Sequence, residues 1–306
     1  SCILRQGERR LSKVNYKKWL SKLGPLFGLL LLIAVITIMN PSFLTVSNIL
    51  NVLRQVTISG LIAFGMTFVV LTGGIDLSVG STLALTGAVA ASLLASGTDP
   101  IIAMGAALIL GLILGAINGV IITKGKVAPF IATLATMTIY RGLTLVYTEG
   151  KPVSGLGDSL TFQMFGKGYL LGIPVPVVTT ILAFIILYFI LHKTTFGRRV
   201  YAVGGNEDAS KLSGINTDRV KIWVYAITGL LASVSALILT SRLNSAQPTA
   251  GESYELDAIA AVVLGGTSLT GGRGWIFGTL VGVLIIGVLN NGMNLIGVSS
   301  FFQQVV

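Results

Sequence analysis

The chain alternates long stretches without charged side chains with short stretches that carry them. Seven uncharged stretches hold 20 residues or more, and two shorter ones cover 127–140 and 258–272. A helix needs about 20 apolar residues to cross the roughly 30 Å of hydrocarbon in a bilayer. The pattern predicts spans near residues 23–40, 55–74, 78–97, 100–122, 128–148, 170–191, 222–241, 256–270 and 275–293, with the start of another at Phe301. The predicted fold class is therefore an all-α, polytopic membrane protein with nine spans and a fragment.

Composition supports this prediction and excludes several kinds of chemistry. Hydrophobic residues make up 53% of the 306 residues and charged residues only 10%, whereas soluble domains carry about 25% charge. Most of the surface is therefore expected to face lipid. A single Cys (Cys2) and a single His (His192) exclude a disulfide framework, a Cys/His zinc site and a histidine-based triad. No glycine-rich stretch has the P-loop pattern that binds ATP phosphates.

Basic residues gather on one side of the predicted topology. If the N-terminus lies inside the cell, 16 of the 21 Lys and Arg residues fall on the cytoplasmic side, as the positive-inside rule requires. The expected organisation is a basic cytoplasmic tail at 1–22 and a transmembrane domain at 23–306 with a cytoplasmic loop at 193–221. Anionic lipid accounts for the net charge of +10, so we expect no binding of nucleic acid.

Internal similarity and interrupted spans indicate where a path could lie. Residues 69–80 resemble 262–272, and Asn118-Gly119 is echoed by Asn291-Gly292, which predicts two loosely repeated halves, as in many transporters. The short stretches 127–140 and 258–272 allow two interpretations. They are broken helices that line a cavity, or complete spans with a charge at one end, such as Arg141, that reaches outward.

Asp76 is the acidic residue nearest to a predicted membrane core. Since it follows Gly73-Gly74 and precedes the next span, one interpretation is a helix cap at the cytoplasmic interface, where its carboxylate accepts free N–H groups. The other is a proton relay, because acids within spans are costly and often functional.

The loop 193–221 contains the signature of one short helix. Asn206 is a good N-cap, Glu207 and Asp208 complement the helix dipole, Lys211 lies in the last turn, and Gly214 stops the helix. Two turns are not stable alone in water. The helix therefore needs a partner surface, either its own membrane domain or a separate cytoplasmic protein.

Three longer motifs carry a resemblance to a known family. They are GMTFVVLTGGIDLSVG (65–80), APFIATL (128–134), and SAQPTAG (245–251) followed by YELDAIAAVVLGG (254–266). With them the chain resembles the ribose-type sugar permeases of bacterial ABC importers over about residues 20–306. The resemblance implies a ten-span permease in the inner membrane with both ends cytoplasmic, its tenth span being completed after this chain ends. It also implies a second permease copy, a cytoplasmic ABC ATPase that binds ATP and Mg, and a periplasmic sugar-binding protein. No cofactor is expected in this chain.

The resemblance also suggests roles for individual residues. The ATPase-coupling helix would comprise Asn206, Glu207, Asp208, Ala209, Ser210, Lys211, Leu212, Ser213 and Gly214. The surface that docks the binding protein, unless it is a plain connecting loop, would include Gln247, Pro248, Glu252, Tyr254, Glu255 and Asp257. The candidates to line the translocation path are Asn118, Asn290 and Asn291. Their amides suit a neutral polyol, but hydrogen bonds between helices would explain them equally well.

The expected function is therefore import of a neutral monosaccharide, most directly D-ribose, by a subunit that is not an enzyme. Xylose, galactose, inositol and a signalling furanose stay open as substrates. A proton- or sodium-coupled secondary transporter would need acids or His deep in a span, and only Asp76 comes close. A membrane enzyme would need a nucleophile with its base, and the sequence presents no such pair.

Overall fold

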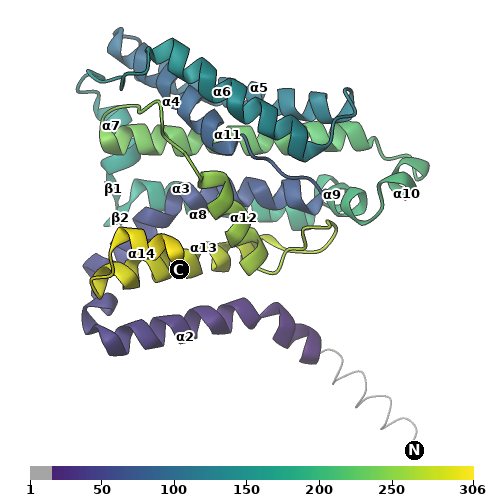
Figure 1. Cartoon of the computed structure of the whole chain (residues 1–306), viewed down its shortest axis with the longest axis horizontal. Coiled ribbons are helices and arrows are strands. Elements are labelled where there is room, and N and C mark those ends of the chain that lie inside the picture. The colour runs from purple at the N-terminus through teal and green to yellow at the C-terminus, as the bar shows by residue number, and fades with distance from the viewer. Residues whose placement is uncertain (1–15) are drawn as a thin grey trace, which may run out of the picture.

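The computed structural model describes residues 16–306 and is built almost wholly from helices (Figure 1). The long helices are α2 (Gly24–Met39), α3 (Val46–Leu71), α5 (Pro100–Thr123), α6 (Pro129–Thr148), α8 (Val175–Lys193), α11 (Thr217–Leu243) and α13 (Ile276–Leu295). Two shorter apolar helices are α4 (Val79–Ala95) and α12 (Tyr254–Leu264). The small elements are η1 (Pro41–Leu44), α7 (Leu160–Lys167), the antiparallel strands β1 (Tyr169–Leu170) and β2 (Ile173–Pro174), α9 (Thr195–Gly205), α10 (Glu207–Leu212) and α14 (Ser300–Val305).

The prediction of an all-α, polytopic membrane protein is confirmed. Six helices are long and apolar enough to cross a membrane, and α2 makes a seventh if it is joined to the helical segment Tyr16–Lys22, from which it bends by 52°. The spans predicted at 78–97 and 256–270 correspond to shorter helices, α4 with 17 residues and α12 with 11, so the predicted lengths are wrong. The fragment predicted from Phe301 corresponds to α14. Of the predicted basic tail, residues 1–15 lie outside the described part of the chain.

Helix boundaries follow local chemistry. Pro100 and Pro129 occupy the first positions of α5 and α6, where a missing N–H costs nothing. The Thr45 hydroxyl accepts a hydrogen bond from the Asn48 N–H at the start of α3, and Asp99 accepts one from the Ile101 N–H at the start of α5. These caps satisfy donors that a helix leaves free at its N-terminus.

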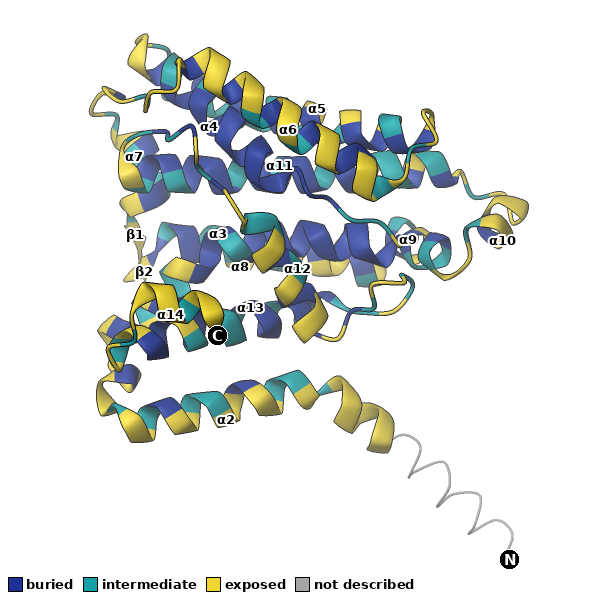
Figure 2. Ribbon diagram, in the orientation of Figure 1, coloured by how far each residue is buried: buried dark blue, intermediate teal, exposed yellow. Residues whose placement is uncertain are grey.

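The helices run between two ends of the bundle. The α9 end carries α9 and α10, and the β1 end carries the β1–β2 hairpin and α7 (Figure 1). In this view α4, α5, α6 and α11 form an upper group, and α3, α8, α12 and α13 lie below them with α2 at the edge. Burial follows this arrangement: the centres of α3, α4 and α11 are buried, whereas α2, α6 and α8 expose apolar faces (Figure 2). Such exposed apolar faces are suited to contact with lipid.

Glycines allow α5 and α11 to pack at close range. Gly111, Gly115 and Gly119 follow each other at four-residue spacing on one face of α5. A Cβ atom on Gly111 would lie 2.6 Å from the Gly229 carbonyl oxygen, and one on Gly119 would lie 2.6 Å from the Ile222 Cα. Small residues at this spacing let helix backbones approach closely in membranes. The pair therefore forms the centre of the upper group.

We expect Gly115→Ala to destabilise the fold, because its Cβ would meet the Tyr225 backbone, and overpacking costs about 1–3 kcal/mol. Gly105→Ala is the matched control, since Gly105 lies on the same helix with no atom within 4 Å of its would-be Cβ. Thermal unfolding of the purified protein in detergent measures both. Equal midpoints for the two variants would contradict the proposed α5–α11 packing.

Candidate translocation and coupling sites

Two segments of the chain leave the helical conformation inside the bundle. The first, residues 72–78, follows the end of α3 at the α9 end and runs back towards the middle, where α4 begins (Figure 1). The second, residues 244–253, follows the end of α11 at the β1 end and also runs to the middle, where α12 begins. The two short helices then leave in opposite directions. Non-helical backbone at such depth is tolerated only where protein or a cavity surrounds it.

The first turn of α4 meets the second segment where Gly80 approaches Gly251. A Cβ atom on either glycine would collide with the carbonyl oxygen of the other, and Gly251 has a φ of +79°. Near the middle of α6, the Arg141 guanidinium donates hydrogen bonds to the carbonyl oxygens of Pro248 (2.9 Å) and Ala250 (2.6 Å). The N-termini of α4 and α12 therefore face each other at about half the depth of the bundle, and we call this region the mid-depth site.

This geometry decides between the two interpretations of the short uncharged stretches. The stretch 127–140 belongs to the continuous helix α6, so the prediction of a break there is wrong. The second interpretation predicted that Arg141 reaches outward. This is also wrong, because its guanidinium donates hydrogen bonds to carbonyl oxygens of the 244–253 segment. For the stretch 258–272 the prediction of a broken helix is confirmed, since α12 ends at Leu264 and the chain continues as a loop.

Side chains from α11 and α6 bind the backbone of the 72–78 segment, and Asp76 binds within it. The Ile75 carbonyl oxygen accepts hydrogen bonds from the hydroxyls of Tyr225 (3.3 Å) and Thr133 (3.4 Å). The Asp76 carboxylate accepts from the Ser78 N–H (2.9 Å) and hydroxyl (2.6 Å). The predicted acceptance of a free N–H before α4 is confirmed, but the predicted interfacial position is wrong, because Asp76 is only 1% exposed; the N-cap residue itself is Ser78. Asp76 is buried because α4, which it precedes, begins at about half the depth of the bundle.

The three asparagine candidates have different surroundings. The Asn118 amide is buried, donates to the Ser78 hydroxyl (2.7 Å) and accepts from the Thr136 hydroxyl (2.6 Å). Asn291 is paired with Asn48 by two hydrogen bonds of 3.0 Å. Both therefore match the alternative of hydrogen bonding between helices. Asn290 is exposed and lines a cavity of about 70 Å³ whose other polar residues are Gln55, Ser59 and Asp257.

The six candidate docking residues lie between the β1 end and the mid-depth site. Pro248 is buried, and Gln247 is half-buried and donates to the Ser245 hydroxyl (3.1 Å). Glu252 and Asp257 are exposed, while Tyr254 and Glu255 are half-buried. Tyr254, Glu255 and Asp257 belong to the first turn of α12. They are therefore recessed from the β1 end of the bundle.

At the α9 end the predicted short helix is present as α10. The Asn206 side chain accepts a hydrogen bond from the Ala209 N–H (2.9 Å), and Gly214 ends the helix with a φ of +89°. Lys221 on α11 donates to the Glu207 carboxylate at 2.8 Å. Burial by itself would raise the pKa of Glu207, but the hydrogen bond and charge of Lys221, together with Lys211, lower it. The carboxylate thus stays ionised and ties α10 to α11, while Leu212 is 91% exposed.

The sequence analysis missed α9, which it treated as loop. The Thr194 hydroxyl caps this helix by accepting from the Gly197 N–H, and Val200 and Val203 are buried. A cap followed by apolar residues at positions 196, 200 and 203 was the available signal. The helix contacts both loops at this end, because Gly204 packs against the Leu71 carbonyl and the Tyr201 hydroxyl donates to the Gly274 carbonyl.

The echoed glycine motifs lie side by side at this end. The Gly272 N–H donates to the Leu71 carbonyl oxygen (2.8 Å), and a Cβ on Gly271 would lie 2.8 Å from the Gly73 nitrogen. One motif leads into α4 and the other into α13. Contacts therefore run from α10 through α9 to the start of the 72–78 segment. A multi-pass bundle with two half-helices meeting inside it, and an exposed helix at one end, has the architecture of a membrane transport protein.

Comparison with known proteins identifies the family. Residues 48–306 match the family described as "Branched-chain amino acid transport system / permease component", and the chain belongs to it. It is 65% identical to the ribose import permease protein of Bacillus subtilis, covering 96% of this chain and 91% of that protein. It is 53% identical to the ribose import permease protein of Escherichia coli K12 (95% and 91%) and 40% identical to the D-allose transport system permease protein of the same strain (95% and 90%). No solved structure matches.

The family settles the class of function. The chain is a multi-pass membrane permease subunit of an ABC importer, and it is not an enzyme. ATP hydrolysis belongs to a separate subunit. Such a permease implies an ATPase and a substrate-binding protein as partners.

We expect Gly251→Ala to disrupt the mid-depth site. Any L-residue at a left-handed position pays roughly 1–2 kcal/mol, and here the new methyl group also meets Gly80. Gly150→Ala is the matched control, with a φ of +71° and open space around its would-be Cβ. The prediction is a lower unfolding midpoint and weaker transport for Gly251→Ala than for Gly150→Ala. Equal unfolding midpoints and equal transport for the two variants would show that the close contact between Gly80 and Gly251 is not required.

Proposed function

We propose that the chain translocates a neutral monosaccharide, most directly D-ribose, that a periplasmic binding protein delivers. The observation that carries this proposal is the identity of 65% and 53%, over nearly the whole chain, to two ribose import permeases. The chemistry of the mid-depth site agrees with it: the cavity beside Asn290 offers amides, a hydroxyl and a carboxylate, which exchange hydrogen bonds with sugar hydroxyls. The 40% identity to a D-allose permease makes a hexose the second candidate.

The proposed orientation has the α9 end in the cytoplasm of a bacterial inner membrane, and therefore a cytoplasmic N-terminal tail. Its support is the placement of basic residues: Lys22, Lys124, Lys126, Arg273 and the segment 193–221 all lie at the α9 end. Short basic segments are retained on the cytoplasmic side. The β1 end then faces the periplasm.

A second copy of the permease is part of the proposal. Support comes from the exposed apolar residues Leu256 and Leu264 of α12 and Ile139 of α6, which are 59%, 46% and 55% exposed. A partner copy seated on this face would enclose the mid-depth site of each protomer, while the apolar faces of α2 and α8 would contact membrane lipid.

The proposed mechanism transmits motion from the α9 end to the mid-depth site. The cytoplasmic ATPase, which holds ATP and Mg, would receive residues 206–214, that is α10 with its flanking residues, as the coupling helix; this chain itself would hold no cofactor. Closure of the ATPases would move α10 and α9, and with them the backbone at Leu71 and Gly272. The half-helices α4 and α12 would then rock, so that the site opens alternately to each end.

The binding protein would dock at the β1 end. The proposed surface retains Gln247, Pro248, Glu252, Tyr254, Glu255 and Asp257 as predicted from the sequence. Because the last four lie close to the mid-depth site, the competing assignment is that they line the path beside Asn290. The carboxylate of Asp257, which faces the same cavity as Asn290, favours that assignment for this residue.

Uptake into vesicles tests the proposed function. The vesicles contain the full-length permease, its ATPase and internal ATP, and D-ribose is supplied with or without the binding protein and a proton uncoupler. We expect uptake that requires ATP and the binding protein and is unchanged by the uncoupler. Unlabelled ribose should inhibit this uptake more strongly than allose, xylose or galactose. Uptake that the uncoupler abolishes at constant ATP would contradict the proposal and favour a proton-coupled transporter.

Leu212→Glu is expected to weaken association with the ATPase and to lower ribose-stimulated ATP hydrolysis, with no change in unfolding midpoint. The reason is that Leu212 contacts nothing that stabilises the fold, being 91% exposed on α10. Leu171→Glu, at a residue that is 97% exposed at the β1 end, is the control and should leave association unchanged. If the Leu212→Glu variant bound the ATPase normally, the assignment of α10 to the coupling surface would be wrong.

A further inference from the structure

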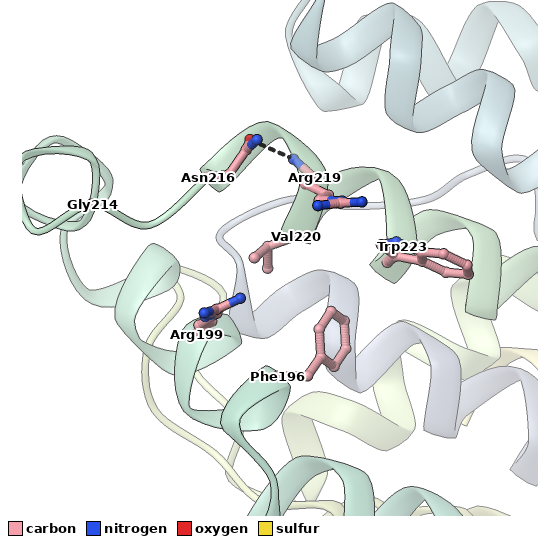
Figure 3. A pocket seen from close by; sticks show the side chains of 7 residues that line it. All are labelled: Phe196, Arg199, Gly214, Asn216, Arg219, Val220 and Trp223. Atoms are coloured by element: carbon pink, nitrogen blue, oxygen red, sulfur yellow. Dashed lines mark hydrogen bonds between the residues drawn. The ribbon is translucent and has the colours of Figure 1, made fainter.

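A pocket of about 320 Å³ lies between α9 and the first turns of α11 (Figure 3). Arg199 and Phe196 on α9 form one wall, and Arg219, Val220 and Trp223 on α11 form the other. Gly214 and Asn216, between α10 and α11, complete the lining. The side chains of Arg199, Arg219 and Trp223 make none of the coupling contacts described above.

The pocket is left positively charged. Neither guanidinium forms an ion pair with any of the residues 16–306, and no acidic residue lines the pocket. The acids nearest in sequence have other partners: Asp218 pairs with Lys124 at 3.2 Å, and Glu207 pairs with Lys221 at 2.8 Å. Two free guanidinium groups facing one cavity are suited to an anion with several oxygens, because each can donate two parallel hydrogen bonds.

An apolar stripe continues from the pocket along α11. From Arg219 in the pocket, the stripe residues Trp223, Ile227, Leu230 and Val234 follow at spacings of three or four and are exposed or half-buried, whereas most of their neighbours on the helix are buried. This spacing places them on one face. Trp223 is 51% exposed and lies between the arginines and the apolar part, the position that Trp prefers at a membrane interface.

We propose that this pocket binds the headgroup of an anionic phospholipid such as phosphatidylglycerol. Arg199 and Arg219 contact the phosphate, Trp223 lies at the level of the glycerol backbone, and an acyl chain follows Ile227, Leu230 and Val234. A soluble phosphate would use the arginines but not the stripe, and an acidic segment of the ATPase would not need an apolar continuation into the membrane. Basic pockets between spans on the cytoplasmic side are known to suit anionic headgroups.

Lipid retention by the purified full-length permease tests this site without the ATPase or transport, so its failure is distinguishable from failure of the proposed function. The protein is equilibrated with mixed micelles of equal phosphatidylglycerol and phosphatidylcholine, and bound lipid is counted by native mass spectrometry. We expect preferential retention of phosphatidylglycerol. Arg199→Gln with Arg219→Gln should weaken it by about fivefold per arginine. Arg198→Gln with Lys126→Gln, which removes two charges at the same end outside the pocket, should leave it unchanged.

Two further arms keep the result decisive. If the double Gln variant does not fold, Arg199→Lys with Arg219→Lys keeps the charge and should weaken retention less, since ammonium groups lack the bidentate geometry. Inorganic phosphate is added as a competitor and should not displace the lipid at equal concentration. The proposal is overturned by equal retention in wild type and the Gln variant or by displacement with phosphate alone. A Gln variant that retains its lipid and, in a separate pull-down, no longer binds the ATPase would assign the pocket to an acidic segment of that partner instead.

Discussion

Backbone polar groups inside hydrocarbon must find partners within the protein, and this requirement governs the centre of the structure. Residues 72–78 and 244–253 are not helical although they lie inside the bundle. They are stable there because side chains replace the missing helical hydrogen bonds. Arg141 binds the carbonyls of one segment, and Tyr225 binds a carbonyl of the other. The direct approach of Gly80 and Gly251 then joins the start of α4, which follows the first segment, to the second segment.

This arrangement connects the proposed coupling site at the α9 end with the proposed translocation site at mid-depth. The Glu207–Lys221 pair ties α10 to α11, and α9 contacts Leu71, the last residue of α3. Leu71 in turn binds Gly272, so the loops that precede α4 and follow α12 are joined at one end. In the proposed mechanism the two half-helices shift while the tightly packed α5–α11 pair stays fixed.

Sequence reasoning recovered what depends on composition and on local chemistry. The uncharged stretches located the long spans, and Asn206, Glu207 and Gly214 located α10 with its cap and end. It failed where tertiary contacts determine how deep in the bundle a helix begins. Residues 78–97 are as apolar as a full span, so nothing local shows that α4 begins at half depth. Asp76 was placed at the interface for the same reason. The Gly111, Gly115 and Gly119 spacing and the cap of α9 were readable signals that were not used.

The central claim is that the mid-depth site opens alternately to the two ends. It is tested most directly by labelling single cysteines at Asn290 and Asp257, after replacement of Cys2, with membrane-impermeant reagents applied from either side. The assembled transporter in vesicles is compared without nucleotide and trapped with ATP. The account predicts that both positions react from one side in one state and from the other side in the other. Reaction from the periplasmic side alone in both states would contradict it and leave these residues as a docking surface.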